Sequence, residues 1–117
     1  MSDSLSDCIF CKIAAGEFAT DYVMETDLVV AFDDLSPQAP THILIVPREH
    51  VSSITQLTEN DRDLIVDVTL VVNRVARLRK IDATGYRVVT NSGPDAGQTV
   101  SHLHWHLLGG APMGPLA

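Results

Sequence analysis

Apolar residues recur at intervals of three and four between residues 59 and 80, which is the spacing of one long amphipathic helix. They are Leu64, Ile65, Val68, Val71, Val72, Val75 and Leu78. Thr58 and Asp61 stand at the two ends of a capping-box pattern. Acidic residues at the start of the segment and basic residues at its end complement the helix macrodipole. The sequence therefore predicts a helix over about 59–80.

The remaining segments show the alternation and punctuation of short strands. The run before Pro47 is apolar almost throughout, as in a strand buried on both faces. The predicted strands are residues 22–25, 28–33, 42–46, 86–90 and 100–108. A short amphipathic helix is predicted over 8–13, with Asp7 as its N-cap. Several antiparallel strands with one long helix indicate an α+β fold.

The chain has 117 residues, 45% of them apolar, which is enough for one domain with its own core. We expect a single domain over residues 1–117, with flexible or dimer-associated tails at 1–7 and 111–117. Because 8 basic residues face 15 acidic residues, the net charge is −7 and the molecule as a whole repels nucleic acid polymers and anionic membranes. An anionic ligand would need a local site.

Cys8 and Cys11 form a C-x-x-C motif. The first eleven residues contain no Lys or Arg, and no apolar run in the sequence approaches the length of a signal segment or a membrane span. These features predict a cytoplasmic protein without a membrane segment. In a reducing compartment the motif is more typical of metal ligands, a redox pair or core residues than of a structural disulfide. Two cysteines alone leave a tetrahedral zinc site incomplete.

His102, His104 and His106 alternate with apolar residues inside the last predicted strand, so the three imidazoles are expected on one face. Imidazoles are costly to bury without partners for both ring nitrogens, which favours a chemical role for the cluster. Two interpretations are open at this point. Either the rings hold a catalytic metal, or one of them is a nucleophile that its neighbours position.

A loop rich in turn residues precedes these histidines. Asn91, Gln98 and Thr99, with the main-chain N–H groups around Gly93 and Gly97, offer neutral donors for phosphoryl oxygens. An imidazole nitrogen can displace a leaving group at phosphorus. The loop and the histidines together therefore indicate phosphorus chemistry.

The run from His102 to Leu108 matches the His-x-His-x-His-x-x signature of the histidine triad (HIT) superfamily. Further segments stand in the order and spacing of its Hint branch, the histidine triad nucleotide-binding proteins; they are residues 9–13, 32–42, 47–50, 97–100 and 107–110. The chain thus resembles this branch over residues 8–110. The resemblance implies a HIT-like α+β fold, in which an antiparallel half-barrel sheet carries one long helix and a short N-terminal helix.

By this resemblance the protein is expected to hydrolyse purine nucleoside 5′-phosphoramidates, such as adenosine 5′-monophosphoramidate. His104 would attack the α-phosphorus, and water would then release the nucleoside monophosphate from the histidine. His42, His102 and His106 complete the implied catalytic group. The implied reaction requires no catalytic metal and no organic cofactor.

The resemblance also implies a nucleotide site. Asp34 would accept the ribose hydroxyls. The implied phosphate loop comprises Asn91, Gly97, Gln98 and Thr99, and the implied base pocket comprises Ile9, Phe10, Phe32 and Leu35. Asp33 stands where the family frequently has a histidine, at the edge of that pocket.

Some members of the superfamily bind zinc at positions that match Cys8, Cys11, His50 and His102. A structural zinc ion is therefore expected, pinning the N-terminal turn to the triad segment and leaving His104 uncoordinated. The alternative is that the cysteines bind no metal, because relatives in the Hint branch do without these cysteines.

The resemblance implies a homodimer built through the long helix and the following strand. Val71, Val72 and Val75 would serve either that interface or the core of one subunit. The tail after Gly110 lacks the basic residue and tryptophan usual in eukaryotic relatives, which leaves the amine specificity open. The alternative functions are a nucleotide-binding regulatory module with little turnover, a dinucleoside polyphosphate hydrolase and a metal-dependent hydrolase.

Overall fold

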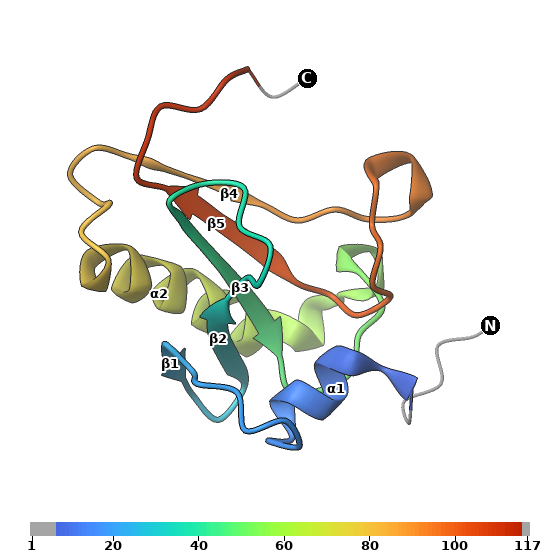
Figure 1. The fold of residues 1–117 in the computed structure, drawn as a ribbon. Helices are drawn as coiled ribbons and strands as arrows, with labels where there is room; N and C mark the ends of the chain where they lie inside the picture. Colours follow the sequence, from blue (N-terminus) through green and yellow to red (C-terminus); the bar gives the residue numbers. More distant parts are fainter. Residues whose placement is uncertain (1–6, 116–117) are drawn as a thin grey trace.

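The computed structural model describes residues 7–115, and over these residues the chain builds a five-stranded antiparallel sheet in the order β1-β2-β3-β5-β4 (Figure 1). The elements are α1 (Ile9–Ala14), β1 (Met24–Glu25), β2 (Val29–Asp33), β3 (Thr41–Pro47), α2 (Arg62–Leu78), β4 (Tyr86–Val89) and β5 (Trp105–Gly109). β5 pairs with both β3 and β4. This pairing brings the strand that carries His106 beside the strand that carries His42.

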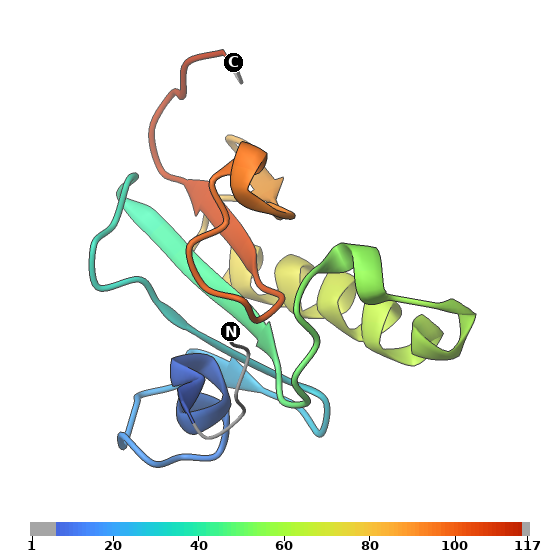
Figure 2. The same cartoon turned by 90° about the vertical axis from the view of Figure 1, so that its right-hand side faces the viewer.

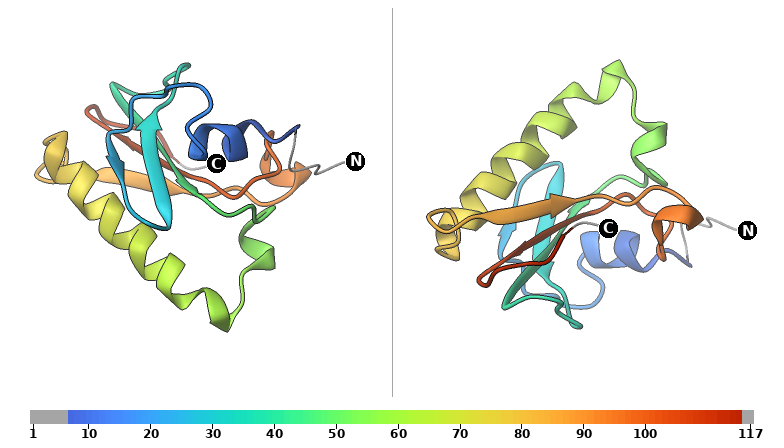
Figure 3. Two further views of the ribbon diagram at one scale, coloured as in Figure 1. Left: turned by 90° about the horizontal axis from the view of Figure 1, so that it is seen from below. Right: turned by 90° about the horizontal axis from the view of Figure 1, so that it is seen from above.

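β3 lies at the centre of the sheet, and a helix covers each face (Figures 2 and 3). Ile43 and Ile45 pack with residues of α2, whereas Leu44 and Val46 pack with residues of α1. Because successive strand residues point to opposite faces, residues 43–46, which lie between the two helices, are apolar at every position. Full burial of each such side chain contributes about 1.5–3 kcal/mol.

The long helix starts as the sequence predicts. Thr58 and Asp61 form a capping box, in which the Asp61 carboxylate accepts from the Thr58 N–H at 2.8 Å. A 3-10 turn over 59–61 leads into α2, so the predicted segment contains both elements. Within residues 7–115, neither α2 nor any other helix is long and apolar enough to cross a membrane.

The apolar residues of α2 divide between the core and the surface. Val71, Val72 and Val75 are buried against the sheet, which confirms the second of the two roles considered for them, the core of one subunit. Val66 and Leu70 are 57% and 43% exposed. An interface on α2 would therefore use these two residues rather than the three valines.

Cys8, not Asp7, is the N-cap of α1, which corrects the prediction. The Cys8 Sγ atom accepts from the Cys11 N–H at 3.3 Å. The same sulfur lies 3.2 Å from the His102 ring, 94 residues away in the sequence. This distant contact fixes Cys8 at the position where its sulfur can cap the helix.

The predicted tails lie only partly within the described residues. Residues 1–6 and 116–117 fall outside them. In the C-terminal tail, the Gly114 carbonyl oxygen accepts from the Arg87 side chain of β4 at 2.8 Å. The last described residues therefore run close to the strand at this edge of the sheet.

Candidate active site

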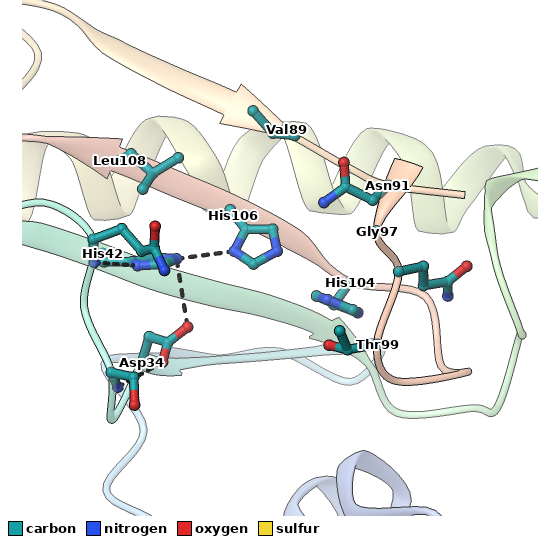
Figure 4. Close-up of a pocket in the computed structure, with 12 residues that line it drawn as sticks. Asp34, His42, Val89, Asn91, Gly97, Thr99, His104, His106 and Leu108 are labelled. Carbon is teal, nitrogen blue, oxygen red and sulfur yellow. Dashed lines mark hydrogen bonds and ion pairs between the residues drawn. The ribbon is translucent and has the colours of Figure 1, made fainter. Parts of the chain in front are cut away.

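A cavity of about 410 Å³ lies where β2 ends and β3 and β5 run side by side (Figure 4). The loop over residues 91–99 closes another side of it. The polar lining includes Asp34, Ser36, Gln38, His42, Asn91, Gln98, Thr99, His104 and His106. Two of the three clustered histidines therefore meet His42 in one place.

His104 is held with one ring nitrogen left for the cavity. Its Nδ1 atom lies 2.7 Å from the carbonyl oxygen of His102. Because a carbonyl oxygen only accepts, Nδ1 carries a proton, and in the neutral ring Nε2 therefore has a lone pair. Phe10 packs edge-on against the ring, with 5.0 Å between ring centroids. A buried, oriented imidazole with an unprotonated nitrogen can act as a nucleophile.

His42 and His106 form a second unit beside His104. His42 Nε2 lies 2.9 Å from His106 Nδ1 and 3.5 Å from Asp34 Oδ2. The main-chain N–H of Gln38 donates to His42 Nδ1 at 3.0 Å. Burial lowers the pKa of His106, the adjacent His104 and His42 rings lower it further, and the Asp34 carboxylate opposes them. His106 is therefore neutral at pH 7, where its ring offers one N–H donor and one lone pair.

His102 does not face the cavity, which corrects the expectation of three imidazoles alternating along one strand. β5 begins only at Trp105, so strand alternation does not reach back to residue 102. The His102 ring points toward Cys8 and Cys11, and its Nε2 atom lies 2.9 Å from the Pro47 carbonyl oxygen. Because the three rings do not converge on one point, the metal-dependent hydrolase lacks its expected ligand set.

Gln98 braces the loop that precedes the histidines. Its side-chain oxygen accepts from the Gly93 N–H at 2.9 Å, and its side-chain nitrogen donates to the carbonyl oxygens of Ser52 and Val100. The Gly97 N–H is bonded within the loop, to the carbonyl oxygen three residues before it. These groups shape the loop, which corrects the expectation that they are free donors for a phosphate.

Asn91 and Thr99 also line the cavity from this loop. Figure 4 shows Thr99 next to His104, with Asn91 on the far side of the ring from it. Each side chain can donate a hydrogen bond without adding net positive charge. Asn91 and Thr99 therefore remain as side-chain donors of the set predicted for this loop.

A second, mostly apolar groove of about 660 Å³ lies between α1 and the end of β2. Three of the predicted base-pocket residues line it, namely Ile9, Phe32 and Leu35. Phe10 does not, because it is buried in the core against the histidine rings. Leu35 follows Asp34 directly in the chain, so the groove and the histidine cavity lie next to one another.

Cys8, Cys11, His50 and His102 form a separate cluster. One ligand-type atom from each of the four lies within 4.8 Å of the others. His102 Nδ1 is 3.2 Å from Cys8 Sγ and 3.5 Å from Cys11 Sγ, and His50 Nδ1 is 3.3 Å from Cys11 Sγ. Two thiols and two imidazoles at this spacing fit a closed tetrahedral zinc site.

Burial holds the Cys11 thiol and the His102 imidazole of this cluster in their uncharged forms. Burial, together with the Cys8 side chain, raises the pKa of Cys11 to about 11. Burial is the main cause that lowers the pKa of His102 to about 4; the nearby His50 and His104 rings act in the same direction, and the hydrogen bond to Pro47 opposes them. A bound cation would favour the thiolate and neutral imidazole that ligation requires. Among the described residues the buried His50 Nε2 atom has no hydrogen-bond partner, whereas His102 Nε2 has Pro47.

Sequence reasoning missed the main-chain groups that orient these rings. The Gln38 N–H, the Pro47 carbonyl oxygen and the His102 carbonyl oxygen each lie 2.7–3.0 Å from an imidazole nitrogen. Any residue type except proline presents the first, and every residue type presents the others. The side-chain pattern therefore held no signal that could have located them.

The fold and the cavity first define a class: a small α+β domain with a polar site built on histidines. The HIT domain family model matches residues 15–113, and the chain belongs to this family. Purine nucleoside phosphoramidase from Escherichia coli K12 is 40% identical over 110 residues, which cover 94% of this chain and 92% of that protein. The chain is therefore a hydrolase of the HIT family.

Solved structures agree with this assignment. A HIT family hydrolase from Clostridium thermocellum has a TM-score of 0.91 and 43% identity, covering 96% of this chain and 97% of that one. A histidine triad protein from Clostridium difficile has a TM-score of 0.90 and 44% identity, covering 95% and 96%. The predicted α+β fold is thereby confirmed.

Proposed function

We propose that this chain hydrolyses the P–N bond of purine nucleoside 5′-phosphoramidates through a nucleotidyl-histidine formed on His104. One observation carries the proposal: the Nδ1–H of His104 donates to the His102 carbonyl oxygen, so that in the neutral ring Nε2 presents a lone pair to the cavity. The phosphoramidase from Escherichia coli, 40% identical to this chain, supports the choice of bond.

The proposed reaction has two steps that use imidazoles and water. The His104 Nε2 lone pair attacks the α-phosphorus, the P–N bond breaks, and the amine leaves with a proton from His106. Water then attacks the same phosphorus and returns a proton to His106, the bond to His104 breaks, and the nucleoside monophosphate leaves.

The nucleotide would lie across the two adjoining depressions. We place the purine in the apolar groove against Ile9, Phe32 and Leu35, and the ribose hydroxyls on the Asp34 carboxylate. The Asn91 and Thr99 side chains would donate to the phosphoryl oxygens. Gly97 and Gln98 serve this site by shaping the loop, and Phe10 by packing against His104.

A structural zinc ion belongs to the proposal. Cys8, Cys11, His50 and His102 would hold it, and it would tie α1 to the segment before β5. A reducing compartment such as the cytoplasm would keep both thiols available as ligands. Elemental analysis of protein purified without chelator tests this, with one zinc ion per chain expected and none contradicting the site.

We further propose a homodimer that uses the exposed residues of α2 and the free edge of β4. β4 is an edge strand of the sheet, and Val88 on it is 42% exposed. On α2, Val66 and Leu70 are also exposed. Light scattering should give twice the chain mass, and Leu70→Glu should shift it toward the monomer. A monomeric wild type would contradict this interface.

Incubation of wild type and His104→Ala with adenosine 5′-phosphoramidate tests the chemistry. Release of the monophosphate, followed by chromatography, should fall by about 10⁴-fold or more in the variant, because the covalent route is removed. Equal turnover contradicts the assignment. Tight binding of nucleotide to wild type with negligible turnover over many amines would instead identify a nucleotide-binding module.

A further inference from the structure

The direction of the hydrogen bond between His42 and His106 is fixed from outside the pair. The Gln38 main-chain N–H donates to His42 Nδ1 at 3.0 Å. An N–H cannot accept, so Nδ1 of His42 must be a lone pair. The single proton of the neutral His42 ring then resides on Nε2.

That proton has one close acceptor. His42 Nε2 lies 2.9 Å from His106 Nδ1 and 3.5 Å from the Asp34 carboxylate. His106 Nδ1 therefore accepts, and the proton of the neutral His106 ring resides on Nε2. The Asp34 carboxylate, which is farther away, also favours a proton on His42 Nε2. In the proposed complex this carboxylate would bind the ribose hydroxyls, and His106 Nδ1 would remain the acceptor.

The alternative arrangement satisfies the same 2.9 Å contact. If His42 carried its proton on Nδ1, its Nε2 would accept from His106 Nδ1, and His106 would turn a lone pair to the cavity. His104 and His106 would then both present acceptors, with no proton between them for a leaving group. One main-chain N–H thus separates a cavity with a proton donor from one without.

Hydrogen bonds hold the main chain that leads to Gln38. The Asp34 N–H bonds to the His42 carbonyl oxygen at 2.9 Å, and the Ser36 N–H bonds to the Asp34 carboxylate at 2.8 Å. Pro37 precedes Gln38, and its ring removes one degree of backbone freedom. These contacts and Pro37 restrict the path of the chain that leads to the Gln38 N–H.

We propose that Gln38 is a positioning residue whose main-chain N–H fixes the protons of His42 and His106, so that His106 presents an N–H at Nε2 to the cavity. This inference rests on the proposed function only for its kinetic consequence. The proton placement itself can be observed without substrate.

The test compares two full-length chains that differ at one group. Position 38 carries alanine in one chain and lactic acid in the other, so an ester oxygen replaces the N–H. Gln38→Ala retains the donor and is the matched control, and Gln38→Pro is a second variant that lacks it. Nitrogen NMR of the histidine rings should place the His106 proton on Nε2 in wild type and Gln38→Ala, and move it toward Nδ1 in the ester chain and Gln38→Pro.

Kinetics supply an independent readout. With an amine leaving group, which needs a proton, the ester chain should lose about 100-fold in kcat relative to Gln38→Ala, the lower end of a typical general-acid contribution. With the 4-nitrophenyl ester of adenosine 5′-phosphate, whose leaving group departs as a stable anion, the loss should be far smaller. An unchanged His106 proton, or equal losses on both substrates, would overturn the inference. If wild type hydrolyses neither substrate, the proposed function fails while the NMR comparison still decides the inference.

Discussion

The histidine cavity and the Cys–His cluster both depend on His102, yet they use imidazole in opposite ways. In the cavity, one nitrogen of each ring is engaged by a carbonyl oxygen, an N–H or another imidazole, and His104 and His106 keep the second for the open volume. In the cluster, His50 and His102 turn Nδ1 toward thiols and bury Nε2. A histidine ring is therefore available for reaction where its second nitrogen faces an open cavity, and it is suited to hold a metal where one nitrogen faces thiols and the other is buried.

His102 joins the two regions through different atoms. Its ring belongs to the cluster with the cysteines, and its carbonyl oxygen accepts from the nucleophile candidate, His104. A change of side chain at the cysteines should therefore affect metal binding first, and catalysis only through the placement of that carbonyl oxygen.

Among the changes that compare the two regions, the largest expected effect is at His106. His106→Ala should lower kcat for an adenosine phosphoramidate by about 1000-fold, because it removes the proposed proton donor. Its zinc content should stay at that of wild type. A variant that loses zinc along with activity would show that the two regions are not independent.

The converse change is Cys11→Ser. Replacing a thiolate ligand should weaken zinc binding by at least about 100-fold, beyond the typical effect of a residue that only supports a ligand. Titration against a zinc-sensitive dye measures the affinity, and kcat should change far less than in His106→Ala. Unaltered zinc affinity would remove Cys11 from the proposed site.

The pH dependence of stability depends on the buried ring of the cluster. The pKa of His102 is about 4 in the folded chain, against 6.5 for an ordinary histidine, so the unfolded chain binds its proton more readily. The contribution of His102 to the free energy of unfolding is therefore fully present above about pH 6.5 and is lost as the pH falls toward 4. In urea unfolding with chelator present, the free energy of unfolding should be about 2 kcal/mol lower at pH 5 than at pH 7. A flat profile would contradict the burial of a neutral ring.

The smallest expected effect lies at the edge of the cavity. Asp34→Asn should raise KM for the nucleotide about tenfold, since it removes a charged acceptor for the ribose hydroxyls. With a 2′,3′-dideoxy substrate, the KM of wild type should rise by the same factor, and the KM of Asp34→Asn should not rise further. Additive losses would place the ribose elsewhere.

The sequence predicted those parts of the molecule that depend on local pattern. The capping box at Thr58, the periodicity of α2 and the apolar run of β3 each result from residues a few positions apart. The triad signature likewise predicted that His104 and His106 lie together, as they do at the cavity. Local spacing was sufficient in each case.

Long-range contacts account for what the sequence did not predict. The first half of the predicted last strand is irregular, and the His102 ring within it meets Cys8 from 94 residues away. The Gln98 side-chain nitrogen donates to the main-chain carbonyl oxygen of Ser52, so this amide holds the loop in place and is not a free donor for a ligand. The resemblance, and not the spacing of ligands, suggested the Cys–His cluster.

The central claim is that His104 becomes covalently attached to the nucleotide. Wild type mixed with adenosine 5′-phosphoramidate, quenched within one turnover and analysed by intact-mass and peptide mass spectrometry, tests it directly. The account predicts an acid-labile adenylyl group on the peptide that contains His104, absent from His104→Ala. Rapid turnover with no adduct at any quench time, or an adduct on another residue, would contradict it.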